Sequence, residues 1–380
     1  GVQTCALPIY TMKNINVPVG ISNFEKIRQD GYYYVDKTGL IKDMLKNKIP
    51  EVTLITRPRR FGKTLAMSML ASFFDIRRDS KKLFQGLNIS KEQQLCNDWM
   101  NQYPTLFLSF KDVDGTIFEN ALGLLQFTIA ELCKKHTYLI ESDVVDQDDK
   151  ETFRKLKSMG SNLPELQGSI IMLMNMMKAY YNKPVILLID EYDVPIAKAS
   201  SNGYYKEMLE VMKAMLSTAL KDNEALKFAV VTGCLKIAKE SVFTGTNNFV
   251  SDTISSERYN EYYGFTQKDV DQILQDAQIE EKASDIKEWY DGYRFGEFDV
   301  YCPWDVMNYL WDLTNNQNAK PVSYWKNTSD NAIIRSFIDY SGAAIKKKLE
   351  ILISGGSIRQ QIEENLTYDY LHSSEENLWS

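Results

Sequence analysis

The stretch that decides the fold is EVTLITRPRRFGKT, residues 51–64. A short apolar run at 52–56 stops at Arg57-Pro58, a turn follows, and a helical pattern begins after Gly62-Lys63-Thr64. Strand, tight loop and helix in this order are typical of a phosphate-binding loop, whose backbone N–H groups face phosphate oxygens. The match is incomplete, because G-x-x-x-x-G-K-[ST] has a glycine where this chain has Arg57.

Lys63 and Thr64 are the candidate phosphate and metal ligands of this loop. We expect the Lys63 amine to be exposed in the empty protein, to reach the β/γ-phosphates and to assist catalysis, and the Thr64 hydroxyl to ligate Mg²⁺. The other residues predicted to bind nucleotide here are Arg59, Arg60, Phe61, Gly62 and Leu65. G-K-T alone occurs by chance in many proteins, so the second half of the site matters.

That second half is PVILLIDEYD, residues 184–193. Five consecutive apolar residues at 185–189 predict a strand that is buried on both faces. Ligands of open α/β sheets bind beyond the carboxyl ends of the strands. Asp190 is therefore placed to hold Mg²⁺, and Glu191 to orient or deprotonate an attacking water. The alternative is a buried strand that ends in ordinary solvated carboxylates.

Composition limits the remaining classes. A chain of 380 residues, 44% apolar and 25% charged, predicts two or three globular domains. A net charge of −7 argues against a surface that coats nucleic acid. The five cysteines form no C-x-x-C pair, and there are only two histidines. The sequence has neither a signal peptide nor an apolar run of about 18 residues, so we expect a cytoplasmic protein with no membrane partner.

Strands and helices alternate along the first 250 residues. Strands are predicted at 52–56, 105–110, 185–189 and 227–232, and helices at 117–134, 164–181 and 204–220. This order predicts an α/β fold, a P-loop NTPase with a parallel sheet flanked by helices.

The strand at 105–110 lies in sequence between the loop strand and the Asp190 strand. If it also lies between them in space, with Glu191 after the metal aspartate, the fold is of the additional-strand type (ASCE, AAA-like). In that class the next strand ends in a polar residue that senses the γ-phosphate. Thr232 has this place, although a threonine that merely ends a strand is the open alternative.

Beyond residue 254 the pattern predicts a helical lid domain. Thr266-x-x-Asp269 reads as a capping box, and helical patterns follow at 287–290, 305–313, 329–338 and 343–353. Arg294 lies between Gly292 and Gly296 and is predicted to sense nucleotide from the lid. A surface salt bridge to a nearby carboxylate, such as Asp291 or Glu297, is the alternative.

These patterns predict four segments. Residues 1–11 read as a non-native leader, 12–250 as the P-loop core with an N-terminal lead, 251–365 as the helical lid, and 366–380 as the start of a truncated C-terminal region. Within the lead, Phe24 and residues 34–38 are expected to line the adenine pocket, with Tyr34 against the ring; a simple packing strap is the alternative.

Six ordered motifs together resemble the AAA-ATPase-like family of bacterial and archaeal proteins. They are YVDKT at 34–38, RPRRFGKT at 57–64, LLIDEYD at 187–193, YYGFT at 262–266, WYDGYRFG at 289–296 and YCPWDVMNYL at 301–310. The family has Arg-Pro-Arg-Arg-Phe-Gly-Lys in place of a glycine-first loop, so the resemblance makes Arg57 a family feature. Its members usually continue into a PD-(D/E)XK nuclease-like domain, which this sequence lacks.

The resemblance implies binding of ATP and Mg²⁺, and hydrolysis that drives a conformational switch. A nucleotide-gated binding or scaffold protein with little turnover, regulating the missing nuclease-like domain, is the alternative. Glu191 disfavours a kinase, because a carboxylate that activates water would waste ATP. Partners implied are a nucleoside triphosphate, nucleic acid through the missing domain, and further copies in an oligomer. The choice between ATP and GTP stays open.

Overall fold

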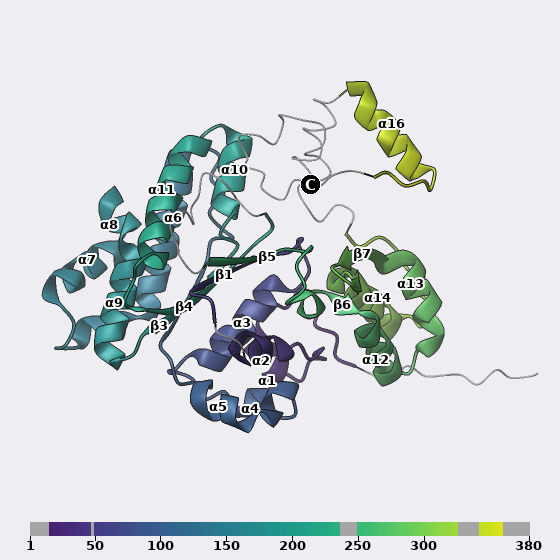
Figure 1. The fold of residues 1–380 in the computed structure, drawn as a ribbon, viewed down its shortest axis with the longest axis horizontal. Coiled ribbons are helices and arrows are strands. Elements are labelled where there is room, and N and C mark those ends of the chain that lie inside the picture. Colours follow the sequence, from purple (N-terminus) through teal and green to yellow (C-terminus); the bar gives the residue numbers. More distant parts are fainter. Residues whose placement is uncertain (1–14, 47–48, 236–248, 326–341, 360–380) are drawn as a thin grey trace, which may run out of the picture.

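A computed structural model describes residues 15–46, 49–235, 249–325 and 342–359. Its centre is a five-stranded sheet in which all neighbouring strands are parallel, in the order β2-β3-β4-β1-β5 (Figure 1). The strands are β1 Val52–Thr56, β2 Thr105–Ser109, β3 Val185–Asp190, β4 Leu226–Gly233 and β5 Phe249–Asp252. The predicted α/β architecture and the four predicted strands are confirmed, with ends that differ by one residue at most.

The position of one strand differs from the expectation. β4, not β2, lies between β1 and β3, and β2 lies at the edge of the sheet beside β3. The idea that the strand at 105–110 separates the other two in space is therefore wrong. Burial gives the physical reason, because the last six residues of β4 are buried, whereas Phe107 and Ser109 of β2 are partly exposed, as suits an edge.

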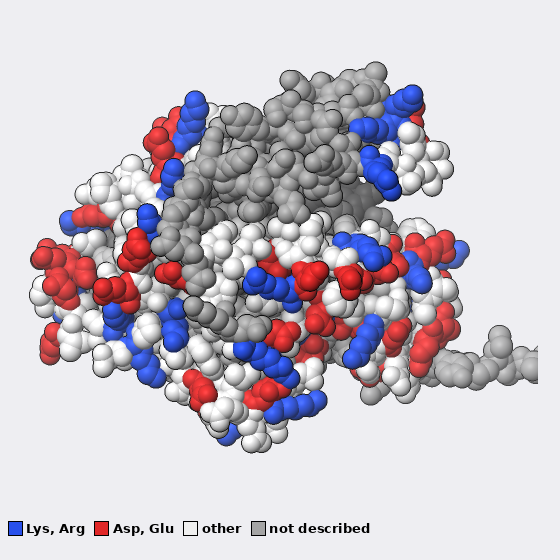
Figure 2. All heavy atoms as spheres, viewed as in Figure 1, with Lys and Arg blue, Asp and Glu red and all other residues white. Residues whose placement is uncertain are grey.

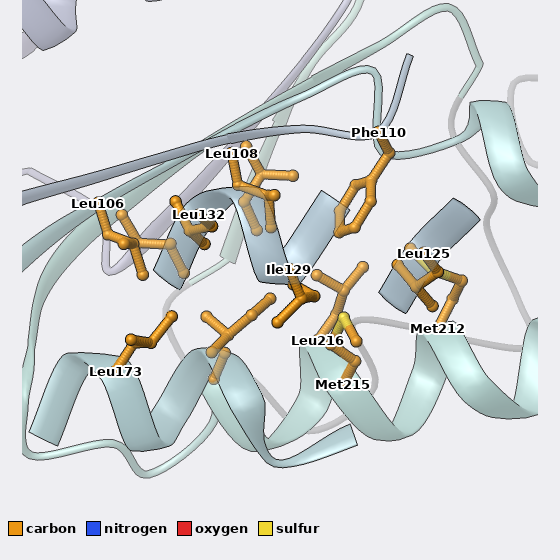
Figure 3. Packing of buried hydrophobic residues seen from close by; sticks show 14 of the residues in the cluster. Leu106, Leu108, Phe110, Leu125, Ile129, Leu132, Leu173, Met212, Met215 and Leu216 are labelled. Carbon is orange, nitrogen blue, oxygen red and sulfur yellow. The ribbon is translucent and has the colours of Figure 1, made fainter. Parts of the chain in front are cut away.

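Helices cover both faces of this sheet, because successive strand side chains point to opposite sides. On one face, Leu106 and Leu108 pack with helical side chains such as Ile129, Leu173 and Met212 (Figure 3). The helical elements from this part of the chain are α6 Phe118–Lys135, η2 Thr137–Glu141, α7 Gln147–Lys157, α8 Leu163–Gln167, α9 Ser169–Tyr181, α10 Val194–Asn202 and α11 Tyr205–Leu220. The predicted helix at 164–181 is thus two helices, α8 and α9, divided at Gly168.

The other face carries α3 Lys63–Phe74, the helix that follows the loop. Side chains of α3 share an apolar cluster with Ile186, Leu188, Phe228 and Val230 of the sheet. Around α3 lie α1 Phe24–Gln29, α2 Gly39–Lys46, α4 Lys81–Phe84, η1 Asn88–Lys91 and α5 Gln93–Trp99. The loop helix is therefore clamped between the sheet and the N-terminal lead.

Beyond the sheet lies a second unit, residues 253–325, seen at the right of Figure 1. It contains η3 Asn260–Tyr262, β6 Phe265–Thr266, α12 Gln267–Ala277, η4 Glu280–Lys282, α13 Ala283–Tyr290, β7 Asp291–Phe295, β8 Phe298–Tyr301 and α14 Pro303–Asn315. The predicted capping box of Thr266 and Asp269 is confirmed. α16 Gly342–Ile353 follows it in the chain and matches the predicted helix at 343–353, whereas the predicted helix at 329–338 lies outside the described residues.

The sequence predicted a helical second unit, but the structure also has strands there. β6, β8 and β7 form an antiparallel sheet, and a tight turn at Gly296 joins β7 to β8. Gly296 has a φ of +55°, and a Cβ there would lie 2.7 Å from Asn260 Nδ2. These strands are only two to five residues long, so their alternation is too brief to stand out in the sequence.

Residues 33–38, which we call the strap, join the second unit to the core. Asp36 accepts hydrogen bonds from the backbone of Thr38 and Asn88, and the Thr38 hydroxyl accepts one from Ile89 N, all within the core. Between them, Lys37 Nζ donates to Asp269 Oδ2 of the second unit at 2.5 Å. Tyr33 donates to Asp276 Oδ2 at 2.7 Å. Even-numbered side chains of the strap thus contact the core and odd-numbered ones the second unit.

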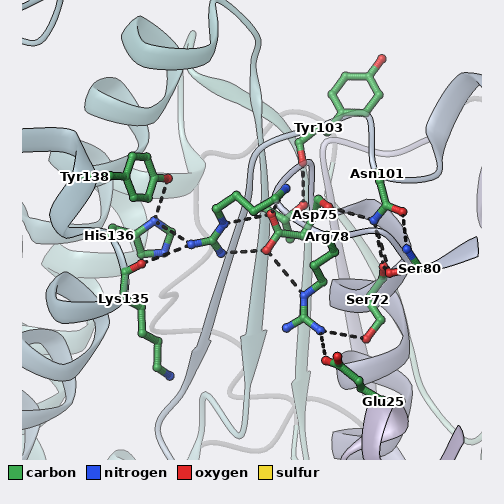
Figure 4. Close-up of polar contacts among 12 residues, drawn as sticks. Glu25, Ser72, Asp75, Arg78, Ser80, Asn101, Tyr103, Lys135, His136 and Tyr138 are labelled. Atoms are coloured by element: carbon green, nitrogen blue, oxygen red, sulfur yellow. Dashed lines mark hydrogen bonds and ion pairs between the residues drawn. The ribbon is translucent and has the colours of Figure 1, made fainter. Parts of the chain in front are cut away.

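A polar network fixes the far end of α3 (Figure 4). The Asp75 carboxylate accepts hydrogen bonds from Arg77 at 2.7 and 3.0 Å. Arg77 Nη1 also lies 3.4 Å from Nδ1 of the buried His136, and Arg78 donates to Glu25 of α1. The loop helix is thereby tied to α6 on one side and α1 on the other.

Charge is distributed unevenly over the surface. Figure 2 shows Asp and Glu side chains gathered at the left edge of the molecule, where α7 lies, with both signs mixed elsewhere on this face. Within the described residues, no helix is both long enough and apolar enough to cross a bilayer.

Candidate functional site

The phosphate loop has two residues in the left-handed region. Arg60 has a φ of +73° and Gly62 a φ of +85°. Gly62 caps α3 without any side-chain hydrogen bond to the first helical amides. Successive amides in such a conformation form a concavity that binds anions, and the positive end of the helix dipole adds to it. The local backbone therefore has a conformation that can bind an anion, although Arg57 stands where a glycine is usual.

Lys63 is folded back onto its own loop. Its amine donates to the carbonyl oxygens of Arg57 at 2.8 Å and Pro58 at 2.9 Å, and lies 3.6 Å from Cys234 Sγ. The residue is only 5% exposed, so the expectation of an exposed amine is wrong. The reason is local: the carbonyl oxygens of the tight loop lie within hydrogen-bond distance of the ammonium group and accept its hydrogen bonds in place of water.

Asp190 accepts hydrogen bonds from two other predicted residues. Thr64 Oγ1 donates to Asp190 Oδ2 at 2.8 Å, and Thr232 Oγ1 donates to Oδ1 at 2.5 Å. The three residues come from the start of α3, the end of β3 and β4, and Asp190 is fully buried. Because parallel strands end at the same edge, residues far apart in sequence meet here.

Glu191 follows at the same edge and lines the adjoining cavity. It has a φ of +54°, a strained conformation for a glutamate of the kind that clusters at functional sites. Burial raises the pKa of Glu191, and the neighbouring Asp190 raises it further, whereas Lys63 and Arg59 oppose the shift. This carboxylate is therefore more basic than an exposed glutamate and better suited to accept a proton.

Asp193 is a site residue that the sequence reasoning missed. Its Oδ2 accepts hydrogen bonds from the backbone of Cys234 at 2.9 Å and Leu235 at 3.0 Å, which fixes the chain after β4. A Cβ on Gly233 would lie 2.6 Å from the Tyr192 ring and 2.7 Å from Asp193 Oδ1, so a larger residue there would require one of these side chains to move. The second aspartate of DEYD was the available signal.

Arg57 is a second residue whose role only the structure explains. Its side chain is fully buried, and it donates to the Asp252 carboxylate at 2.5 Å and to Asn260 Oδ1 at 2.7 Å. The guanidinium also lies 5.2 Å from the ring centre of Tyr263. Arg57 thus links the start of the loop to β5 and to the second unit.

Phe61 makes a parallel connection. Its ring lies 4.8 Å from that of Tyr293 and 5.1 Å from that of Phe295, centre to centre. Its carbonyl accepts a hydrogen bond from Gly264 N, whose φ is +91°. A Cβ at Gly264 would lie 2.2 Å from Val300. The motifs YYGFT and WYDGYRFG therefore meet beneath the phosphate loop, which accounts for Gly264, Tyr293 and Phe295 of these motifs.

A cavity of about 540 Å³ opens beside this loop. Its walls are the phosphate loop, the N-terminal lead at 18–22, 33–35 and Lys37, and the start of α14. At the loop end it is lined by Lys63, Thr64 and Glu191, and at the α14 end by Trp304, Met307 and Asn308. The Arg60 guanidinium lies 3.8 Å from the ring centre of Trp304, so a loop residue closes onto the second unit.

Most of the predicted binding residues line this cavity. They are Arg59, Arg60, Phe61, Gly62, Lys63, Thr64, Leu65 and Glu191, while Asp190 and Thr232 lie buried beneath its floor. Arg294 does not line it. Its side chain on β7 is 68% exposed, and Nη1 lies 3.7 Å from Asp299 Oδ1, which is the surface salt bridge to a nearby carboxylate given above as the alternative, with Asp299 as the partner. Tyr34 does line the cavity, whereas Phe24 is buried behind it.

Comparison with known proteins identifies the family of this chain. A curated protein of Azotobacter chroococcum mcd 1, described as "Uncharacterized protein in vnfD 5'region", is 29% identical over 298 residues. The aligned part covers 78% of this chain and 52% of that protein, so the chain spans about half the length of this relative. The profile of the family described as Predicted AAA-ATPase matches residues 18–243, more than half of the chain. The chain therefore belongs to this predicted AAA-ATPase family.

Proposed function

We propose that this protein binds ATP and hydrolyses it in a Mg²⁺-dependent reaction whose cycle moves the second unit. The observation that carries the proposal is the charge of the cavity. Six cationic side chains and one carboxylate, that of Glu191, line it, although the net charge of the chain is −7. The cationic residues are Lys37, Arg59, Arg60, Lys63, Lys111 and Lys198. Its far end is apolar and aromatic, which suits a base joined to a polyanion.

The loop end would take the triphosphate. Amides at the start of α3 would donate to phosphate oxygens at the positive end of the helix dipole. The Lys63 ammonium, which now bonds to two loop carbonyls, would exchange them for phosphate oxygens. The α14 end, with Trp304 and Met307 across from Tyr34, would take the base.

The residues beneath the loop fit Mg²⁺. A buried carboxylate and a hydroxyl, Asp190 and Thr64, form the oxygen donor set that this ion prefers beside substrate phosphates. Thr232 holds the other carboxylate oxygen and so fixes the orientation of Asp190. When bound, the ion would neutralise charge on the β- and γ-phosphates.

Glu191 would serve as the base. Its carboxylate takes a proton from water while the water oxygen bonds to the γ-phosphorus. The bond from that phosphorus to the β–γ bridging oxygen breaks, and its electron pair stays on ADP. The raised pKa of Glu191 favours the proton transfer, and the products are ADP and inorganic phosphate.

The strand order supports assignment to the additional-strand class. β4 separates the loop strand from the Asp190 strand, Glu191 directly follows Asp190, and β4 carries Thr232 near its end. In this interpretation Thr232 reports the state of the γ-phosphate through its bond to Asp190.

We further propose that residues 251–365 act as the lid of a core formed by 12–250. Arg57 and Phe61 of the loop contact Asn260, Tyr293 and Phe295 of the second unit directly. Loss of the γ-phosphate contacts would change the loop, and these side chains would pass that change on.

The same contacts would equally serve a nucleotide-gated scaffold with little turnover. Release of phosphate from ATP and Mg²⁺, measured without any acceptor, separates the two functions. Turnover that disappears in Glu191→Gln supports the hydrolase, whereas tight binding without turnover in the parent supports the scaffold. A parent protein that binds no nucleotide would refute both.

A further inference from the structure

Two lysines outside the phosphate loop, Lys111 and Lys198, line the same cavity. Neither belongs to the loop or to the Asp190-Glu191 pair, and they come from different elements. We propose that both contact the γ-phosphate of the bound nucleotide, so that a single chain supplies the cations that complete its site. This inference rests on the proposed function and adds to it a preference for triphosphates over diphosphates.

Lys111 is brought to the site by the edge strand β2. In the pairing of β2 with β3, Ser109 lies opposite Asp190, and Phe110 N donates to Asp190 O at 3.1 Å. The chain therefore leaves β2 beside Glu191, with Lys111 as its first residue beyond that hydrogen bond. Among the described residues, the Lys111 ammonium has no ion-pair partner.

Lys198 reaches the same side from α10. This helix begins at Val194, whose N–H donates to Glu191 O at 3.2 Å. Val194 and Lys198 are four residues apart and both line the cavity, as expected for one face of a helix. Lys198 thus lies one helical turn beyond Val194, the residue whose N–H bonds to the proposed base Glu191.

The reaction gives these positions a purpose. As the γ-phosphoryl group leaves ADP, negative charge is spread over its three outer oxygens, and a positioned cation stabilises it. Lys63 and the loop amides approach from the α3 side. Lys111 and Lys198 approach from the β2 and α10 side, where Glu191 would hold the water. The two lysines would therefore act on charge that a diphosphate does not carry.

The test compares three lysine-to-glutamine variants of the full chain. Lys111→Gln and Lys198→Gln remove the proposed contacts, and Lys213→Gln on α11 is the matched control, because Lys213 is exposed and away from the cavity. Each is assayed for turnover of ATP with Mg²⁺ over a range of protein concentrations. Affinities for ADP and for a non-hydrolysable ATP analogue are measured by calorimetry.

We expect each site variant to lower kcat by about tenfold or more, a part of what one positioned cation can contribute. Affinity for the triphosphate analogue should fall while affinity for ADP stays within about twofold of the parent, less than 0.5 kcal/mol. Specific activity of the parent should not depend on protein concentration, because no second chain is needed.

Three results would overturn the inference. In the first, Lys111→Gln and Lys198→Gln behave like Lys213→Gln in both turnover and analogue affinity. In the second, ADP and analogue affinities fall together, which would mean general attraction of anions. In the third, specific activity rises with protein concentration, so that a second chain completes the site. Absence of nucleotide binding by the parent would instead refute the proposed function itself.

Discussion

Arg57 and Asp252 form an ion pair with no measurable exposure at the arginine, Nη2 lying 2.5 Å from Oδ1. The pair joins the first residue of the phosphate loop to the end of β5. Where other loops use a glycine so that the chain can turn freely, this one anchors its first residue by charge.

Asp252→Ala should strongly destabilise the protein. It leaves a buried guanidinium without its counter-ion, and removal of one partner of a buried pair costs about 3–5 kcal/mol. Urea unfolding measures this loss. Replacing both partners by apolar residues, Arg57→Met with Asp252→Leu, should recover much of it. A single variant as stable as the parent would show that the pair does not hold the loop.

Lys63→Ala should weaken ATP binding by at least about tenfold, or 1.4 kcal/mol. The amine would be lost from the phosphates, and the carbonyls of Arg57 and Pro58 would lose their donor. Calorimetry on Lys63→Ala and on the exposed control Lys206→Ala measures the effect. Equal affinity in Lys63→Ala and the parent would remove Lys63 from the phosphate site.

Asp190 and Glu191 should have separable effects. Asp190→Ala should abolish the tightening of nucleotide binding by Mg²⁺, because the buried carboxylate beside Thr64 is its anchor. Glu191→Gln should keep binding and lose about 10²–10⁴-fold in turnover. Titration of nucleotide with and without Mg²⁺ checks the first, and phosphate release checks the second. Parent-like turnover in Glu191→Gln would assign the base elsewhere.

His136 should make stability depend on acid. Burial, with Arg77 and Lys135 nearby, lowers its pKa from 6.5 to about 3. Between these values the unfolded chain binds a proton that the folded chain does not, so stability falls as the pH drops. The slope is at most about 1.4 kcal/mol per pH unit. His136→Gln should show a shallower fall between pH 6.5 and 4.5 in urea unfolding. Parallel curves for parent and variant would contradict the assignment.

Arg60→Ala and Arg294→Ala should differ. Arg60 lies over Trp304 at the cavity, so its loss should raise the KM for ATP. Arg294 is exposed and lies 3.7 Å from Asp299, so we expect Arg294→Ala to keep the turnover of the parent and a Tm within a couple of degrees of it. Loss of turnover in Arg294→Ala at unchanged Tm would restore the nucleotide-sensing role that the sequence predicted for this residue.

The sequence predicted the parts of the site that depend on local pattern. The turn at Gly62, the strand that ends at Asp190 and the cap at Thr266 each follow from neighbouring residues, and the structure has them. Apart from the burial of Lys63 and the division of one helix at Gly168, what failed depends on contacts between distant segments. No local pattern shows that β4 enters between β1 and β3, or that Arg57 meets Asp252. The strands of the second unit were missed for a related reason, because each is too short to be recognised without its partner.

The alternating contacts of the strap require a fixed number of residues in it. Its contacts alternate: Asp36 bonds to the core, whereas Tyr33 and Lys37 bond to the second unit. Deleting or inserting one residue between Tyr33 and Thr38 would turn the side chains on one side of the change to the opposite face, so that they would no longer meet their present partners. A point substitution in the strap would cost a single contact, whereas a change of one residue in length would break several contacts at once.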